Sequence, residues 1–231
     1  MTERDATGRS ALDQGRILAA AVEFIDAHGL RELTMRRLGA HLGVEGMALY
    51  RHVPGRDALL DGVVETVVDD LFNDPDVRIE ATDGWQDYLQ RTATGMRRLA
   101  LAHPEIFPLV ATRPPAAPWV RPPLRSLRWI ETFLVALRSC GFSDDAAVAT
   151  YRAFSSFLLG YLLLEVSSRG VEIGPVENGE SPAVDDLGRY PNVRRLEKQL
   201  SRDLHDADFE EALEALIDRV VLLLPAKRRH C

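Results

Sequence analysis

The stretch TMRRLGAHLGVEGMALYRHVPGR, residues 34–56, predicts two short helices joined by a tight turn. Thr34 is suited to cap the first helix with its hydroxyl, and Leu38 and Leu42 fall on one apolar face of that helix. Gly43 ends it, because a chain that reverses within a few residues needs a left-handed backbone position, which glycine adopts without a steric penalty. The second helix, expected at about 45–52, is too short to be stable alone in water. The pattern therefore predicts a helix-turn-helix whose second helix enters the major groove of DNA.

The same stretch reverses the charge of the chain. It carries four arginines against one acid, Glu45, whereas the whole chain has a formal net charge of -7. The arginines are Arg36, Arg37, Arg51 and Arg56. Arginines on a helix often form only a solvated face, but these coincide with the corner glycine of the motif. A basic surface attracts a duplex through phosphate neutralisation and counterion release, so we expect double-stranded DNA as a partner.

The order of eight residues in this motif matches a known pattern: Thr34, Arg36, Leu38, Gly43, Val44, Leu49, Tyr50 and His52. This order resembles the N-terminal domain of the TetR family of transcriptional repressors. A second segment, WQDYLQRTATGMRRLALAHPEIFPLVATRPP at residues 85–115, resembles the ligand-binding domain of the tetracycline repressor subgroup. The resemblance covers nearly the whole chain. It implies a homodimer that binds a palindromic operator and that a small-molecule effector releases.

The resemblance and the side-chain chemistry together predict the residues that contact DNA. They are Thr34, Arg36, Gly46, Met47, Ala48, Tyr50, His52 and Arg56. Arg36 is able to grip a guanine with two hydrogen bonds or to contact a phosphate, and the resemblance favours the base. Tyr50 and His52 match family positions that touch the DNA backbone, and Arg56 matches a phosphate-binding lysine. For Tyr50, packing in the core is the alternative.

The second helix departs from the tetracycline repressor pattern. Gly46 and Met47 stand where that repressor has a glutamine and a proline, and a glycine has no side-chain donor with which to read adenine. We therefore expect a different operator, in which Met47 and Ala48 contact a thymine methyl group.

Length and periodicity predict an all-α chain in two parts. At 231 residues the chain exceeds the commonest domain size, and no strand pattern is evident. We expect a disordered N-terminus at 1–9, a three-helix helix-turn-helix DNA-binding domain at 10–56 and a connecting helix at 57–72. A larger helical domain for ligand binding and dimerisation is expected at 73–231.

Within these parts, helical periodicity predicts the individual elements. Ser10 and Asp13 match a capping box at the start of the first helix, which Gly29 ends. The later helices are expected at about 57–72, 85–103, 105–110, 124–140, 144–169, 193–204 and 209–224. A connector at 73–84 and a long loop at 170–191 separate some of them.

Cysteine and histidine usage disfavours several classes of protein. The two cysteines, Cys140 and Cys231, form no CxxC pair, so neither a disulfide framework nor a zinc finger is expected. The six histidines show no ligand or triad spacing, so we expect no metal, no cofactor and no enzymatic activity. The first ten residues lack the apolar core of a signal peptide, and the apolar run at 157–164 is too short to span a bilayer. A cytoplasmic protein without a membrane partner is expected.

Aromatic and polar residues of the C-terminal part predict a ligand pocket. The candidates are Phe72, Tyr88, Thr92, Met96, Leu109, Arg113, Trp129, Phe133, Phe157 and Tyr161. Aromatic residues at helical spacing are more often core than ligand contacts, so packing is the alternative for each. Arg113, Arg152 and Glu165 are candidate polar anchors.

The resemblance also indicates which effector to exclude. Phe72, Thr92, Leu109 and Leu164 correspond to positions at which the tetracycline repressor holds its drug and a magnesium ion, through a histidine, an asparagine and other polar groups. A leucine in place of a histidine cannot ligate a metal. We therefore expect a small, largely apolar and metal-independent effector in place of tetracycline with magnesium.

The sequence also predicts how the chain dimerises and how an effector releases it from DNA. The apolar surplus of the helices at 144–169 and 209–224 predicts a four-helix interface between two copies of the chain. Effector binding would move the helix at 57–72 as a lever. The turn at Thr112, Arg113 and Pro114 is either a hinge for that movement or a plain helix stop. A helical ligand-binding or protein-interaction module that has lost DNA binding is the alternative function, and activation in place of repression stays open.

Overall fold

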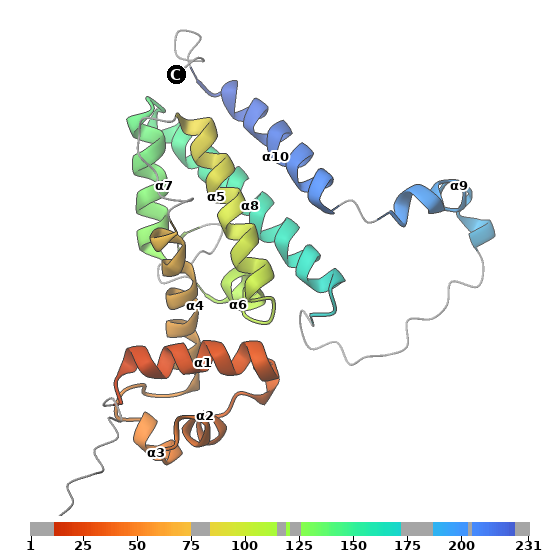
Figure 1. The fold of residues 1–231 in the computed structure, drawn as a ribbon. Helices are drawn as coiled ribbons and strands as arrows, with labels where there is room; N and C mark the ends of the chain where they lie inside the picture. Colours follow the sequence, from red (N-terminus) through yellow and green to blue (C-terminus); the bar gives the residue numbers. More distant parts are fainter. Residues whose placement is uncertain are drawn as a thin grey trace, which may run out of the picture. The chain divides into compact units, whose positions relative to one another are not determined.

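The computed structural model describes residues 12–74, 84–114, 119–120, 126–171, 187–202 and 205–224. All regular structure within these ranges is helical, as expected (Figure 1). The predicted disorder at 1–9 and the role of Cys231 lie outside the described residues, and the connector at 73–84 and the loop at 170–191 lie largely outside them.

The helices follow in chain order: α1 (Gln14–His28), η1 (Leu30–Glu32), α2 (Met35–Leu42), α3 (Gly46–Leu49), α4 (Arg56–Asn73), α5 (Trp85–Ala102), α6 (Phe107–Thr112), α7 (Leu127–Ser139), α8 (Asp144–Ser168), η2 (Leu187–Arg189), α9 (Pro191–Leu200) and α10 (His205–Val221). They form two compact units. Unit 1 comprises Met1–Arg78 and Gly95–Glu131, and unit 2 comprises Ile79–Thr94 and Thr132–Cys231. Each unit therefore takes part of α5 and part of α7.

In unit 1, α1 begins later than the sequence indicates. Asp13 is itself the N-cap, since its carboxylate accepts a hydrogen bond from the Arg16 N–H at 2.8 Å. Ser10, the other half of the predicted capping box, lies outside the described residues. The helix approaches α4 closely at Gly62, where a Cβ would lie 2.6 Å from Leu18 Cδ2. The absence of a side chain at Gly62 thus sets the distance between α1 and α4.

The first helix and the turn of the motif form as expected. Thr34 Oγ1 accepts a hydrogen bond from the Arg37 N–H at 3.2 Å, and Gly43 adopts a left-handed conformation with φ of 70°. The second helix, α3, is shorter than the predicted 45–52. Single turns continue it, since Leu49 O accepts from His52 N–H at 3.0 Å and from Val53 N–H at 2.9 Å. Pro54 disfavours a helical conformation for Val53, the residue before it, so these turns go no further.

In unit 2, Phe133 of α7 is the centre of an aromatic core. Its ring lies 5.6 Å from Tyr88 of α5, and 5.7 Å and 5.3 Å from Tyr151 and Phe154 of α8, measured between ring centroids. Ser143 caps α8 by accepting from the Ala146 N–H at 3.2 Å, as expected. The three helices are therefore tied together by aromatic contacts deep inside the unit.

Helix α8 has the length and composition of a membrane span, alone among the helices of the described ranges. Its side chains at Phe154, Leu158 and Leu162 are buried in unit 2, with 2% exposure or less. A core helix of this length meets the same criterion, so the apolar composition of α8 is explained by packing.

Candidate DNA-binding site and ligand-binding residues

The two helices of the motif touch through their backbones. A Cβ on Gly39 of α2 would lie 2.9 Å from the Gly46 Cα and N atoms and 2.9 Å from the Val44 carbonyl oxygen. Side chains do not approach a backbone that closely, so glycine at position 39 is what allows α3 to lie directly against α2. Main-chain contacts therefore hold α3 in position against α2.

Gly46 takes part in the same contact from the other side. A Cβ at this position would lie 3.1 Å from the Arg36 Cα and 3.2 Å from the Met35 carbonyl oxygen. Position 46 therefore faces α2. The structure thus packs Gly46 against α2, and the DNA contact predicted for it from the resemblance stays a prediction.

The opposite side of α3 is open to solvent. Met47 is 75% exposed and Tyr50 is 46% exposed, while Ala48 is half-buried and His52 is exposed. The exposure of Tyr50 speaks against core packing. Met47, Tyr50 and His52 are thus accessible to a partner, and their contacts with DNA stay predictions.

The arginines near the motif divide into engaged and free side chains. Arg37 forms an ion pair with Glu32 and lies over the Phe24 ring at 5.5 Å. Arg56 donates to the Leu33 and Leu30 carbonyl oxygens at 3.3 Å and 3.4 Å, and so ties the start of α4 to the chain before α2.

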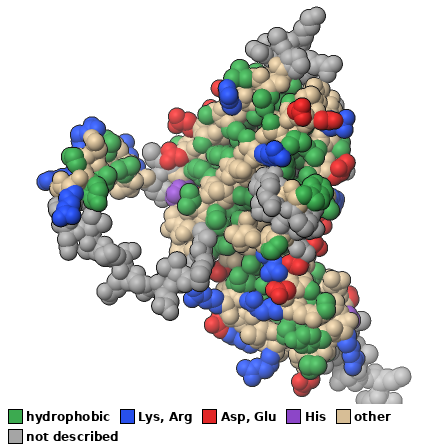
Figure 2. Space-filling view, turned by 180° about the vertical axis from the view of Figure 1, so that it is seen from behind, with side chains coloured by type: hydrophobic (Ala, Val, Ile, Leu, Met, Phe, Trp, Pro, Cys, Tyr) green, Lys and Arg blue, Asp and Glu red, His purple; other side chains and the backbone are tan. Residues whose placement is uncertain are grey.

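Within the described part of the chain, the side chains of Arg36 and Arg51 have neither a hydrogen bond nor an ion pair, and both are exposed. Arg51 is absent from the predicted DNA-binding set, although its spacing from buried Leu49 and Val53 was a signal for an outward position. Figure 2 shows Lys and Arg side chains on one face of the molecule. For Arg56, two of its five N–H groups are used, so the predicted phosphate contact requires the other three.

The predicted ligand residues of unit 1 are tied to structural contacts. Phe72, at the end of α4, meets Trp129 of α7 with ring centroids 6.2 Å apart, and the Arg128 guanidinium lies 4.3 Å from the Phe72 centroid. Met96 of α5 is 1% exposed, and Leu109 of α6 is half-buried. These contacts are typical of a protein core. Packing was the alternative to ligand binding for each of these candidates.

Arg113 has a different role from the predicted anchor. Its Nε atom donates to Asp61 Oδ1 at 2.7 Å, and its Nη2 atom donates to the Asp57 carbonyl oxygen at 3.2 Å. The side chain is only 16% exposed and therefore joins the end of α6 to α4. Its charge is used in this pair, and the predicted contact with an effector stays a prediction. His103 Nδ1 lies 2.7 Å from Asp26 Oδ2 and similarly links the end of α5 to α1.

In unit 2 the predicted residues fall into two groups. Tyr88 and Phe133 are buried in the aromatic core, and Thr92, 1% exposed, has a hydroxyl without a hydrogen bond of normal geometry. Burial raises the pKa of the Tyr88 hydroxyl, and the nearby Thr92 hydroxyl offsets only a small part of that rise. The first group thus combines aromatic rings with an unsatisfied polar atom.

The second group, Phe157 and Tyr161, is bound to α10. Their rings lie 5.9 Å and 5.2 Å from the Phe209 ring, and the Tyr161 hydroxyl donates to the His205 carbonyl oxygen at 2.9 Å. These contacts favour packing over ligand binding. Of the other anchors, Glu165 is buried and accepts from Arg169 Nη2 at 3.1 Å.

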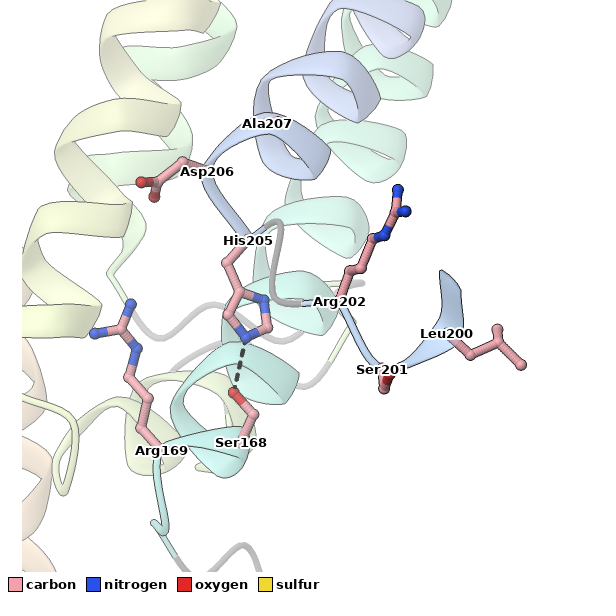
Figure 3. A pocket seen from close by; sticks show the side chains of 8 residues that line it. All are labelled: Ser168, Arg169, Leu200, Ser201, Arg202, His205, Asp206 and Ala207. Carbon is pink, nitrogen blue, oxygen red and sulfur yellow. Dashed lines mark hydrogen bonds between the residues drawn. The ribbon is translucent and has the colours of Figure 1, made fainter. Parts of the chain in front are cut away.

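A hollow of about 800 Å³ lies in unit 2 where α8 ends and α10 begins, and no predicted ligand residue lines it. In Figure 3 the side chains of Arg169 and Arg202 point in different directions, so they do not converge on one bound group. Ser168 Oγ lies 3.2 Å from His205 Nε2 but donates its hydrogen to the Glu165 carbonyl oxygen at 2.7 Å. His205 therefore acts as the donor, and the pair is not an activated nucleophile.

A smaller hollow of about 250 Å³ lies in unit 1 between α4 and α5, with Val67, Leu71 and Leu99 among its lining residues. It too contains no predicted ligand residue. Over the described residues, no group of three His, Cys, Asp or Glu side chains is arranged to hold a metal ion.

Comparison with known proteins gives two family matches. Residues 17–63 match the model of bacterial regulatory proteins of the tetR family, and residues 79–221 match that of the tetracyclin repressor-like C-terminal domain. A HTH-type transcriptional regulator of Saccharopolyspora erythraea is 31% identical over 163 residues, which are 71% of this chain and 65% of that protein. The tetracycline repressor protein class C of Escherichia coli is 29% identical over 207 residues, 89% of each chain.

One solved structure is similar to this chain in both fold and sequence. It is the Streptomyces coelicolor TetR family protein ActR in complex with (S)-DNPA, with a TM-score of 0.66 and 26% identity. The alignment covers 91% of this chain and 98% of that one. The helical scaffold described above is therefore one in which a related protein binds a small organic ligand.

Proposed function

Because the chain belongs to the TetR family of bacterial regulatory proteins, we propose that it is a ligand-responsive transcriptional repressor. It binds a palindromic operator as a homodimer, and a small, largely apolar effector releases it. The cytoplasm is its expected location. The observation that carries this proposal is the geometry of the helix-turn-helix. Thr34 caps α2, and the contact between Gly39 and Gly46 holds α3 against it. An exposed face of α3 then lies near the free side chains of Arg36 and Arg51.

The proposed dimer rests on an exposed stripe of α8. The stripe runs along the helix as Ala149, Ala153, Ser156, Gly160 and Leu164, all exposed. A Cβ on Gly160 would meet no atom within 4 Å, and Leu164 is 73% exposed. Small side chains followed by a large apolar one favour a close crossing with a second copy of the helix. Helix α10 uses Phe209, Leu213, Ile217 and Val220 within its own chain, so it adds less apolar surface than the sequence indicated.

The proposed effector rests on the first group of unit 2. Tyr88 and Phe133 contribute aromatic rings, and Thr92 contributes one buried hydroxyl that forms no hydrogen bond of normal geometry within the described residues. A mostly apolar wall with few polar groups suits an aromatic ligand that carries one or two hydrogen-bonding atoms.

The proposed release mechanism rests on contacts within unit 1. The Arg113 to Asp61 pair joins α6 to α4, and the His103 to Asp26 pair joins the end of α5 to α1. A displacement of α6 would therefore be transmitted to α4 and to the DNA-binding helices. Only an effector that binds the released state more tightly than the operator-bound state drives that change.

We expect the full chain to bind a duplex that contains a palindrome, with affinity that falls steeply as salt is raised. The Arg36→Ala variant should lose about 1–3 kcal/mol of binding free energy, because a bidentate contact to guanine is worth that much. The measurement uses duplexes from the region upstream of its own gene and duplexes selected from a random pool. Arg37→Ala, whose arginine is already paired with Glu32, is the matched control.

Failure of the full chain to select any duplex would contradict DNA binding and favour the alternative, a ligand-binding or interaction module. The same complex, once obtained, serves to identify the effector, since addition of the correct aromatic compound should dissociate it.

We expect Leu164→Asp to convert the dimer to a monomer, because the substitution places a charge inside the proposed interface. Sedimentation equilibrium measures the mass, and operator binding should weaken at the same protein concentration. Leu127→Asp, which replaces an exposed leucine of α7 outside the stripe, is the control. A dimer that persists in Leu164→Asp would exclude this face of α8 as the interface.

A further inference from the structure

Arg51 occupies the centre of the face that α3 turns away from its own domain. Leu49 and Val53 are buried at 0% and 1% exposure, and Gly46 faces α2. At about 100° per residue, these three positions define an inward direction, and Arg51 lies within about 20° of the direction opposite to it. The main-chain bond from Val53 N–H to Leu49 O, 2.9 Å long, keeps residues 49–53 in a helical turn, so this geometry extends to Arg51.

The neighbours of Arg51 on this face have smaller reach or lie to the side. Measured as rotation about the helix axis, Met47 and Ala48 lie about 40° and 60° from Arg51. Tyr50 and His52 each lie about 100° from it. A helix that enters the major groove directs its central side chains to the base edges and its lateral ones to the phosphates. Arg51 is thus placed toward the floor of the groove.

Its side chain is also available. Over the described residues, the Arg51 guanidinium has no hydrogen bond and no ion pair, in contrast to Arg37 and Arg56. A free guanidinium presents a planar fork of donors that matches the O6 and N7 acceptors of guanine. A lysine in its place would supply a charge but not the two parallel hydrogen bonds.

We propose that Arg51 is a specificity-determining residue of the operator contact and reads a guanine through O6 and N7. The proposal rests on the DNA binding proposed above. Met47 precedes Arg51 by one helical turn, about 6 Å along the axis. Since base pairs are about 3.4 Å apart, the guanine stands within about two steps of the base that Met47 contacts. Arg51 and Met47 then compensate for the reading function that Gly46 lacks.

The test compares the wild-type chain with Arg51→Ala and Arg51→Lys on the selected operator and on its single-base variants. We expect Arg51→Ala to weaken binding to the selected operator by at least fivefold. The preference for guanine should vanish at one pair of symmetric positions and persist elsewhere. Arg51→Lys should keep most of the salt dependence while losing most of that preference. Arg36→Ala is the matched control, because it should relax a different pair of positions.

The outcomes separate the two levels of the proposal. Uniform weakening on all sequences with a smaller salt slope would mean a phosphate contact, and an unchanged affinity would mean no contact, so either result overturns the assignment alone. If the wild-type chain binds no duplex, the proposed function fails and this assignment falls with it. Arg51 is exposed, so circular dichroism should show the same thermal unfolding for all variants.

Discussion

Phe133→Ala is expected to reduce the free energy of unfolding by about 3–5 kcal/mol, the usual cost of removing a large aromatic side chain from a core. The Phe133 side chain is 0% exposed, and its ring is in contact with Tyr88, Tyr151 and Phe154. The change leaves a cavity at the point where α5, α7 and α8 meet. Tyr151 and Phe154 of α8 cannot move to fill this cavity, because each already packs against its own neighbours.

Urea unfolding followed by circular dichroism measures this loss, at a fixed protein concentration because the proposed dimerisation would contribute to stability. Trp119→Ala is the control, since Trp119 is 81% exposed and should change stability by less than about 0.5 kcal/mol. A loss below about 1.5 kcal/mol for Phe133→Ala would mean that the site collapses around the alanine, contrary to the view of Phe133 as the centre of the core.

Gly39→Val is expected to abolish operator binding and to destabilise the DNA-binding helices by about 3 kcal/mol. The added Cβ alone would lie 2.9 Å from main-chain atoms of Gly46 and from the Val44 oxygen, and the two valine methyl groups extend further. Main-chain atoms cannot turn aside as a flexible side chain does, so α3 must move. Gly39→Ala should be milder, because alanine gains about 1 kcal/mol of helix propensity against part of the clash.

Thermal unfolding and operator binding measure both variants. Gly15→Val is the control, because a Cβ at Gly15 meets only the Asp13 carboxylate at 3.5 Å, an ordinary contact. Wild-type operator affinity in Gly39→Val would show that α3 does not need to touch α2, and it would refute the backbone contact as the basis of the site.

The parts of the fold that the sequence predicted correctly depend on local chemistry. Thr34 caps α2, Gly43 supplies the left-handed turn, and Ser143 caps α8, because each acts on residues only a few positions away. The regular part of α3 is shorter than expected, and single turns complete the segment as far as Val53.

The parts that could not be predicted depend on residues far apart in the chain. No pattern in the sequence shows that Arg113 meets Asp61, fifty-two positions earlier, so it was assigned to the effector. The packing of Gly46 against α2 could not be predicted for a related reason, because the direction of its missing side chain is set by the crossing of α2 and α3. The resemblance correctly supplied the family, but the role of a single position had to come from geometry.

The backbone contact between Gly39 and Gly46 also bears on how this type of protein diversifies. Since main-chain atoms hold α3 in place, the residues at 47, 48 and 51 contribute little to the stability of the domain. Mutations there are free to accumulate without a loss of folding, and each one alters the set of promoters that the regulator recognises. Duplicated copies of such a gene would therefore acquire new targets by drift at three surface codons, while the interior of the domain stays under selection.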